Sequence, residues 1–136
     1  MDKIPLFIIS VIIVAGVVFW AFQSGFFSKN NVTPTPLPEG IVLFYSPDCP
    51  HCKNVEDFIA QNGIDQKIKY TRLEVPFGIK TSPELQANAA ALLQKAETCK
   101  IDTTNGISIP FIWDGKACLV GDEPIINFLK AQAGIK

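Results

Sequence analysis

Histidine is nearly absent from this 136-residue chain, because the single one is His51. A metal site built on two or three histidines is therefore excluded. The chain also lacks a strong charge of either sign, since its formal net charge is -1, and its field does not favour nucleic acid as a partner. Cysteine is scarce as well, and the four residues are Cys49, Cys52, Cys99 and Cys118. An even number permits two disulfide bonds without requiring them.

Polar residues are missing from most of the N-terminal segment. The 19 residues from Ile4 to Phe22 contain no charge and one hydroxyl, Ser10. About 20 apolar residues are needed for a helix to cross a bilayer. The stretch is too long for an ordinary cleaved signal peptide and lacks a clear cleavage site, and it also lacks the polar face of a buried core helix. We therefore expect residues 1–27 to form an uncleaved signal anchor, a transmembrane helix.

The short, positively flanked N-terminal tail sets the expected orientation of this single-pass membrane protein. Lys3 and the terminal amine precede the apolar stretch, and Lys29 follows it. With so short a tail, we expect the N-terminus inside and the C-terminal domain on the extracytoplasmic side. Residues 28–39 are rich in proline and threonine and predict an extended linker. The folded domain then spans residues 40–136.

The domain contains segments with alternating strand and helix patterns. Predicted strands occupy residues 41–45, 68–75, 107–113 and 116–120. Predicted helices occupy residues 50–62, a segment that starts at Pro83 after the N-cap Ser82, and a segment capped by Asp122 and ended by Gly134. A βαβ unit followed by a ββα unit predicts an α/β fold, with a mixed four-stranded sheet between helices on both faces.

The motif Cys49-Pro50-His51-Cys52 lies between the first strand and the first helix of the domain. Free N–H groups and the helix dipole favour a thiolate at a helix N-terminus. We therefore expect Cys49 to be an exposed nucleophile and Cys52 a more buried resolving thiol. Pro50 suits the first helical turn because it has no N–H to leave unpaired. His51 can add positive charge near the thiolate, which makes the corresponding disulfide a better oxidant.

These residues resemble a known family. The segment FYSPDCPHC followed by a helix is similar to the active site of the thioredoxin superfamily. The CPHC tetrad is similar to that of bacterial periplasmic disulfide oxidases, whereas the tail SIPFIWDGKACLVGDEPIINFLK looks more like glutaredoxins. The resemblance covers the domain from Ile41 onward. It implies a thioredoxin/glutaredoxin-like three-layer α/β/α fold, preceded here by the transmembrane helix.

The resemblance also implies a substrate site. In the family, a cis proline starts the third strand and faces the cysteines, and Pro110 occupies that place. The backbone of Ile109 would then bind an extended substrate, and Gly121 and Asp122 would flank the same groove. The alternative for Pro110 is a trans proline at a strand edge.

Two positions depart from the thioredoxin pattern. Leu43 replaces the buried acid of the first strand, as in glutaredoxins, and Asp48 replaces the tryptophan before the first cysteine. Asp48 would oppose a thiolate at Cys49 if its side chain pointed there. The alternative, which we favour, is that Asp48 is a solvated turn residue.

Three roles are open for Cys99 and Cys118. They could form a structural disulfide, which would stabilise the domain by ~3 kcal/mol. They could form a second redox pair that exchanges with Cys49 and Cys52, or they could be two buried small side chains. We favour the structural disulfide, because an extracytoplasmic domain permits it.

The leading functional hypothesis is a thiol–disulfide oxidoreductase that acts through Cys49 and Cys52. Its partners would be proteins or small molecules with thiols or disulfides and a membrane or soluble redox partner, and it would need no cofactor, with glutathione as a conceivable co-substrate. One alternative is a metal-binding module in which the cysteines ligate zinc or an iron–sulfur cluster. Another is a non-catalytic thioredoxin-fold adaptor whose Cys49–Cys52 bond is fixed. The sequence leaves open whether the reaction oxidises, reduces or isomerises disulfides.

Overall fold

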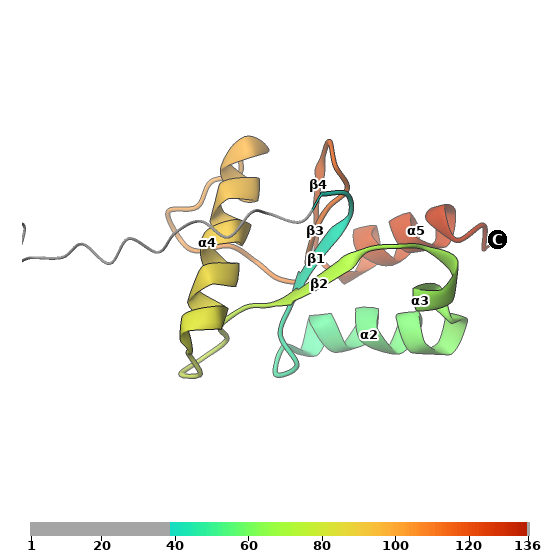
Figure 1. The fold of residues 1–136 in the computed structure, drawn as a ribbon, viewed down its shortest axis with the longest axis horizontal. Coiled ribbons are helices and arrows are strands. Elements are labelled where there is room, and N and C mark those ends of the chain that lie inside the picture. The colour runs from blue at the N-terminus through green and yellow to red at the C-terminus, as the bar shows by residue number, and fades with distance from the viewer. Residues whose placement is uncertain (1–38, 136) are drawn as a thin grey trace, which may run out of the picture. The chain divides into compact units, whose positions relative to one another are not determined.

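A computed structural model describes residues 39–135 of the chain. Within this part, strands and helices follow one another in the order shown in Figure 1: β1 (Val42–Tyr45), α2 (Pro50–Asn62), α3 (Ile64–Lys67), β2 (Thr71–Glu74), α4 (Pro83–Thr98), β3 (Phe111–Trp113), β4 (Cys118–Val120) and α5 (Asp122–Gln132). The predicted membrane helix over residues 1–27 and nearly all of the predicted linker over residues 28–39 lie outside the described residues. Between residues 39 and 135, none of the helices has the length and hydropathy of a membrane span.

The four strands form one mixed sheet in the order β2-β1-β3-β4. Strand β1 is parallel to β2, with Phe44 opposite Leu73. It is antiparallel to β3, with Phe44 opposite Phe111, and β3 is antiparallel to β4. The predicted mixed four-stranded sheet is therefore confirmed. The continuous apolar run of β1 is explained by its central place in the sheet, where both of its faces are covered.

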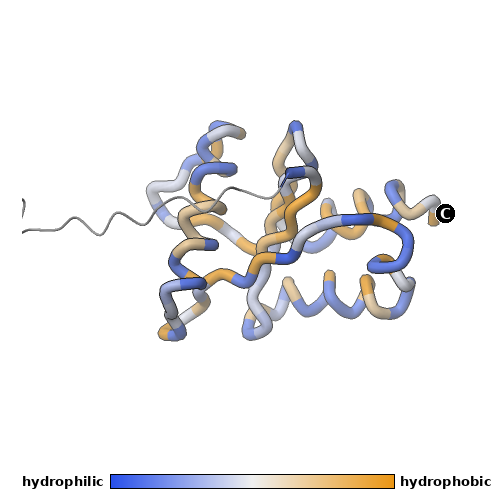
Figure 2. The backbone as a smooth tube through the Cα atoms, in the orientation of Figure 1, coloured by the Kyte–Doolittle hydropathy of each residue, from blue (hydrophilic) through white to orange (hydrophobic). Residues whose placement is uncertain are grey.

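Helices cover both faces of the sheet. In Figure 1, α4 lies on one side of the strands, and α2 and α5 lie on the other. Successive side chains of a strand point to opposite faces, so Leu43 packs with residues of α2 and α5 while Val42 and Phe44 pack with residues of α4. Figure 2 shows the central strands as mainly hydrophobic. Two small cores, one on each face, therefore hold the domain together.

Local signals explain where two of the helices begin and end. Cys49 is the N-cap of α2 and Pro50 its first residue, and Gly63 ends the helix in a left-handed conformation with φ of 59°. At α4, the Ser82 hydroxyl accepts a hydrogen bond from the backbone N–H of Leu85 at 3.2 Å. The predicted start of this helix at Pro83 is confirmed.

Three details of the predicted elements are wrong. The strands β2, β3 and β4 are shorter than predicted, and β3 begins only after Pro110, which has no N–H to donate to a neighbouring strand. The short helix α3 follows Gly63, where the pattern predicted only the end of α2. Asp122 is the first residue of α5 rather than its N-cap, because Gly121 holds the N-cap position without a side-chain hydrogen bond.

Candidate active site

Cys49 lies where the backbone turns from β1 into α2. Its backbone N–H donates to the Ser46 carbonyl at 3.1 Å, which closes the turn. As the N-cap of α2, its sulfur accepts a hydrogen bond from the backbone N–H of Cys52 at 3.4 Å. An N-terminal N–H that would otherwise lack a helical partner is thus directed at this sulfur. A donor directed at the sulfur from the helix N-terminus is the placement expected for a nucleophilic cysteine.

Cys52 lies one turn into α2 and is fully buried. Burial, followed by the hydrogen bond between its thiol and Cys49, raises the pKa of Cys52 to about 12. Cys52 therefore keeps its proton at neutral pH. Both cysteines are free thiols in this structure, so the pair is in its reduced form.

The segment before β3 comes close to Cys49 although it is 60 residues away in sequence. The Cys49 thiol donates to the carbonyl oxygen of Ile109 at 3.7 Å. The Ile109–Pro110 peptide bond is cis, as the resemblance implies, and Pro110 is fully buried. The structure thus brings the predicted motif and the predicted substrate-binding segment together.

A polar cluster joins the start of α2 to the start of α5. The Asp122 carboxylate accepts a hydrogen bond from the side-chain amide of Asn54 at 2.6 Å and lies 3.2 Å from Nδ1 of His51. The hydrogen bond from Asn54, and then the one from His51, lower the pKa of Asp122 to about 2. The carboxylate is therefore ionised at neutral pH. This carboxylate is the contact that orients the His51 ring, and the His51 side chain is still 70% exposed.

The predicted site residues converge on one pocket of about 800 Å³. Its lining includes six of them, namely Cys49, Pro50, His51, Ile109, Gly121 and Asp122. The expectation that Cys49 is exposed is wrong, because only 4% of its surface is accessible. Its sulfur is reached through the pocket, whose walls cover it. Cys52 is still the more buried of the pair, as predicted.

The two departures from the thioredoxin pattern have simple structural roles. Leu43 is fully buried in the core on the α2 and α5 face of the sheet. The Asp48 carboxylate forms an ion pair with Lys80 at 2.5 Å, and both side chains are substantially exposed. Asp48 therefore behaves as a solvated turn residue whose charge is balanced by a lysine.

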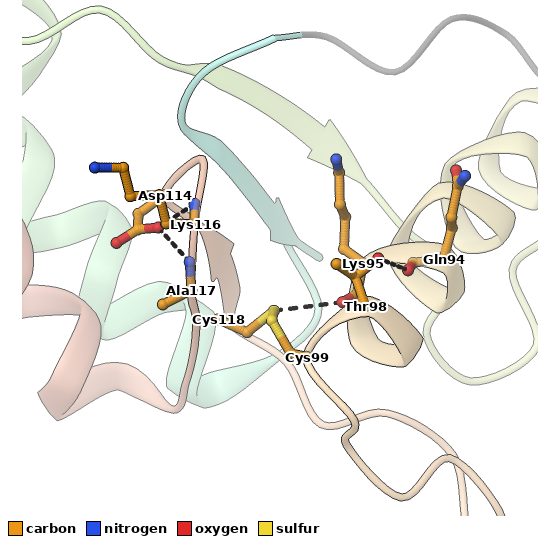
Figure 3. The surroundings of a disulfide bond; sticks show 8 residues. All are labelled: Gln94, Lys95, Thr98, Cys99, Asp114, Lys116, Ala117 and Cys118. Carbon is orange, nitrogen blue, oxygen red and sulfur yellow. Dashed lines mark hydrogen bonds between the residues drawn. A yellow bond between two sulfur atoms is a disulfide. The ribbon is translucent and has the colours of Figure 1, made fainter.

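Cys99 and Cys118 form a disulfide bond, so they are not two unpaired buried side chains, and a structural bond and a second redox pair both fit this observation. Cys99 is the C-cap of α4 and Cys118 is the first residue of β4, and their Cα atoms are 6.1 Å apart. Figure 3 shows the bond beside the last turn of α4, where the Cys118 sulfur lies 3.4 Å from the carbonyl oxygen of Lys95. The Lys95 ammonium also lies 4.6 Å from the centre of the Trp113 ring. The C-terminal end of α4 is thus attached to the edge of the sheet.

The four cysteines do not gather into one metal site. Two of them are consumed by the disulfide between Cys99 and Cys118. Among residues 39–135, no group of three or more histidine, cysteine, aspartate or glutamate side chains is placed to hold a metal ion. Of the four cysteines, Cys49 and Cys52 are therefore the two that carry free thiols.

Sequence reasoning missed two parts of the site. Asn54 has the spacing of an exposed helical residue, and no local signal links it to Asp122, 68 positions away. The side of the pocket formed by α4 and by the residues after β2 has the composition of ordinary core. Neither part has a recognisable sequence signature. The sequence as a whole matches no protein-family model, and no curated protein matches it.

Proposed function

We propose that this domain is a thiol–disulfide oxidoreductase of the thioredoxin superfamily, with Cys49 as nucleophile and Cys52 as resolving thiol. The observation that carries the proposal is the placement of Cys49 as the N-cap of α2, with the N–H of Cys52 directed at its sulfur at 3.4 Å. Support comes from the nearness of Cys49 to Ile109, at 3.7 Å, across 60 residues of sequence. The strand order β2-β1-β3-β4 with helices on both faces also fits the thioredoxin-like fold that the resemblance implies.

The two thiols would divide the reaction into two exchange steps. In the first, the Cys49 thiolate attacks one sulfur of a substrate disulfide, and a new sulfur–sulfur bond forms while the other substrate sulfur leaves as a thiolate and takes up a proton. In the second, Cys52 loses its proton and attacks the Cys49 sulfur, which releases the second substrate thiol. Two electrons and two protons pass to the substrate, and a Cys49–Cys52 disulfide remains. Oxidation of a substrate dithiol is the same sequence in reverse.

The high pKa of Cys52 supports this division of roles. A thiol that keeps its proton, with a pKa of about 12, does not compete with Cys49 for the first attack. It becomes a nucleophile only when a base removes its proton, after Cys49 has been converted to a mixed disulfide. The order of attack therefore follows from burial.

The location we propose is the extracytoplasmic side of a membrane, to which residues 1–27 would anchor the domain. The disulfide between Cys99 and Cys118 supports this location, because such bonds persist in oxidising compartments and are rare in the cytosol of most organisms. Neither a metal nor an organic cofactor is needed for the exchange reaction. The partners would be proteins with thiols or disulfides, together with a redox partner that restores the starting form.

Turnover of a small disulfide by the full-length chain tests the proposal. We expect the wild-type protein to catalyse exchange between a thiol and 2-hydroxyethyl disulfide, and Cys49→Ser to abolish the catalysis. The control is the double variant Cys99→Ser/Cys118→Ser, which should remain active below its unfolding temperature. Full activity of Cys49→Ser would show the proposal to be wrong. A redox titration of the Cys49–Cys52 pair then gives the direction, and a potential below about -300 mV would favour a fixed bond in a non-catalytic adaptor.

A further inference from the structure

The pocket beside Cys49 is lined by both polar and apolar residues. Among the polar ones are His51 and Asp122, which contact each other. Six apolar residues form a surface that we name the apolar wall, and its members are Val75, Pro76 and Phe77 after β2 and Ala89, Leu92 and Leu93 of α4. A pocket of about 800 Å³ has the size of a typical binding site for a small molecule or a few residues of peptide.

The apolar wall contains exposed apolar surface that packing does not explain. Val75 and Leu92 are buried members of the core. Phe77 and Leu93, by contrast, are 41% and 40% exposed. Among the described residues, the large hydrophobic side chains that remain exposed are these two and Ile79. Apolar surface gathered in a concave site next to a reactive group is typical of a binding site.

The charges of the lining argue against glutathione as the ligand. Glutathione carries two carboxylates and one ammonium group, and its recognition requires cations and a free acceptor. The described residues that line the pocket include no lysine or arginine. Asn54 and His51 both contact Oδ2 of Asp122, so this carboxylate could still accept the ammonium group at Oδ1. A charged tripeptide would therefore bring two carboxylates into a pocket whose described lining offers neither of them a lysine or an arginine.

We propose that the apolar wall determines the substrate class, and this inference rests on the proposed function. The pocket binds a bulky apolar side chain, such as phenylalanine or leucine, that neighbours the reacting cysteine of a protein or peptide substrate. The side chain covers Phe77 and Leu93 while the substrate sulfur approaches Cys49 in the same pocket. Glutathione and other charged small thiols are poor substrates.

Support for this occupant comes from continuity between the apolar wall and the reactive sulfur. Cys49 and the six residues of the apolar wall line one pocket rather than two. An apolar group bound there would be held beside the thiol, which lowers the entropic cost of reaching the transition state. The Asn88 side-chain amide donates to the Glu74 carbonyl at 2.8 Å and ties α4 to the end of β2, so both sides of the apolar wall are held in place.

Peptide turnover by the full-length chain tests the inference. Two short peptides, each with one cysteine in a mixed disulfide with thionitrobenzoate, would differ only in phenylalanine or serine beside the cysteine. In a single turnover of the reduced protein, whose two thiols supply the electrons, we expect the second-order rate constant to be about tenfold higher for the phenylalanine peptide, the discrimination typical of an apolar pocket. The mixed disulfide of glutathione should react no faster than the serine peptide. Equal rates for the two peptides, or a preference for glutathione, would overturn the inference.

Charged substitutions in the apolar wall provide the second part of the test. Phe77→Glu and Leu93→Glu should each remove the preference for the phenylalanine peptide over the serine peptide. The matched control is Ile79→Glu, because Ile79 is a fully exposed hydrophobic residue two positions from Phe77 and outside the pocket lining. An equal loss in the control variant would contradict the inference. Using two independent positions guards against a folding defect in one variant, which circular dichroism detects.

Failure of the inference and failure of the proposed function give different results. If 2-hydroxyethyl disulfide is turned over without any peptide preference, the substrate class is wrong and the oxidoreductase activity stands. If no disulfide is turned over, the proposed function is wrong, and binding of unreactive peptides with serine in place of cysteine decides the inference. Fluorescence anisotropy should then show tighter binding of the phenylalanine peptide, with the preference lost in Leu93→Glu. Equal binding of the two unreactive peptides would overturn the inference.

Discussion

The two pairs of cysteines occupy opposite ends of helices. Cys49 is the N-cap of α2, whereas Cys99 is the C-cap of α4. Backbone N–H groups at a helix N-terminus stabilise a thiolate, and carbonyl groups at a C-terminus destabilise one. A thiolate would be destabilised at the other cysteine of this pair as well, because the Cys118 sulfur lies 3.4 Å from the carbonyl oxygen of Lys95. One pair therefore lies where a reactive thiolate is favoured, and the other lies where a permanent bond is favoured.

The pairs also differ in how much of the chain they connect. Cys49 and Cys52 are three positions apart and belong to the same end of one helix. Cys99 and Cys118 are 19 positions apart and connect α4 to β4. The stabilisation gained from a disulfide grows with the loop that it closes. Under the proposed function, the domain would open and close the first pair without a large change in stability, while the second pair would stabilise the fold throughout.

Replacing the resolving thiol should have the largest effect, because it stops the reaction after the first exchange. In Cys52→Ser, the mixed disulfide at Cys49 has no neighbouring thiol to release it, and covalent complexes with substrates should accumulate. Non-reducing electrophoresis followed by mass spectrometry would detect them. The control is Cys118→Ser, which also removes one member of a pair but should trap no substrate at Cys49. Equal trapping in both variants would remove the distinction between the pairs.

Removing the second pair should instead reduce stability. We expect Cys99→Ser/Cys118→Ser to lower the free energy of unfolding by about 3 kcal/mol, the value for a loop of this size. Cys49→Ser/Cys52→Ser should lower it by less than about 1 kcal/mol relative to the reduced wild type, because it breaks no long-range bond. Urea unfolding of the full-length chain, followed by circular dichroism, measures both. Similar losses of unfolding free energy in the two double variants would show that the disulfide between α4 and β4 does not add stability beyond that of the Cys49 and Cys52 side chains.

The smallest effect concerns the non-covalent connection at the active site. The pKa of Asp122 is lowered from 3.8 to about 2, first by Asn54 and then by His51. The folded state therefore binds fewer protons than the unfolded state, so this contribution is fully present above pH 3.8 and is lost as the pH falls toward 2. Asp122→Asn should be slightly less stable than wild type at pH 6, and the difference should vanish near pH 2. Thermal unfolding at a series of pH values measures this.

A matched carboxylate provides the control for that prediction. Asp57 pairs with Lys53 on the exposed surface of α2, and an exposed pair of this kind contributes little to stability. The free energy of unfolding of Asp57→Asn should therefore stay close to that of the wild type at every pH from 6 to 2. The stability that the Cys99–Cys118 bond contributes should not change with acid, and it should be lost when a strong reductant breaks the bond. If Asp57→Asn and Asp122→Asn showed the same pH-dependent loss of stability, the special contribution assigned to Asp122 would be wrong.

The sequence was sufficient to predict the features that depend on neighbouring residues. The apolar run of β1, the start of α4 at Ser82-Pro83 and the start of α2 at Cys49 are each determined by side chains within a few positions. The mixed sheet followed from the order of these elements. Whether Cys99 and Cys118 pair at all was left open, because pairing depends on the distance between α4 and β4 in the folded chain.

Features that depend on distant contacts could not be predicted in the same way. Asp122 follows a glycine and precedes a helix, which is the pattern of an N-cap, but its side chain is drawn to Asn54 across 68 positions. Cys49 was expected to be exposed because helix N-termini usually are. The pocket walls that bury it come from α4 and the residues before β3, and no local pattern reports how closely these segments approach the thiol.

The Cys99–Cys118 bond has a consequence for the biosynthesis of the protein. Four cysteines can pair in three ways, and in two of these each reactive cysteine is joined to a distant partner. Cys49 and Cys52 leave the ribosome well before Cys118 does. An oxidant that acts on the unfinished chain meets the reactive pair first, and the native bond can close only after α4 and β4 have come together. Under the proposed function, a newly made chain would need an external thiol oxidant, and an isomerase if the wrong cysteines pair, before it could act on the disulfides of other proteins.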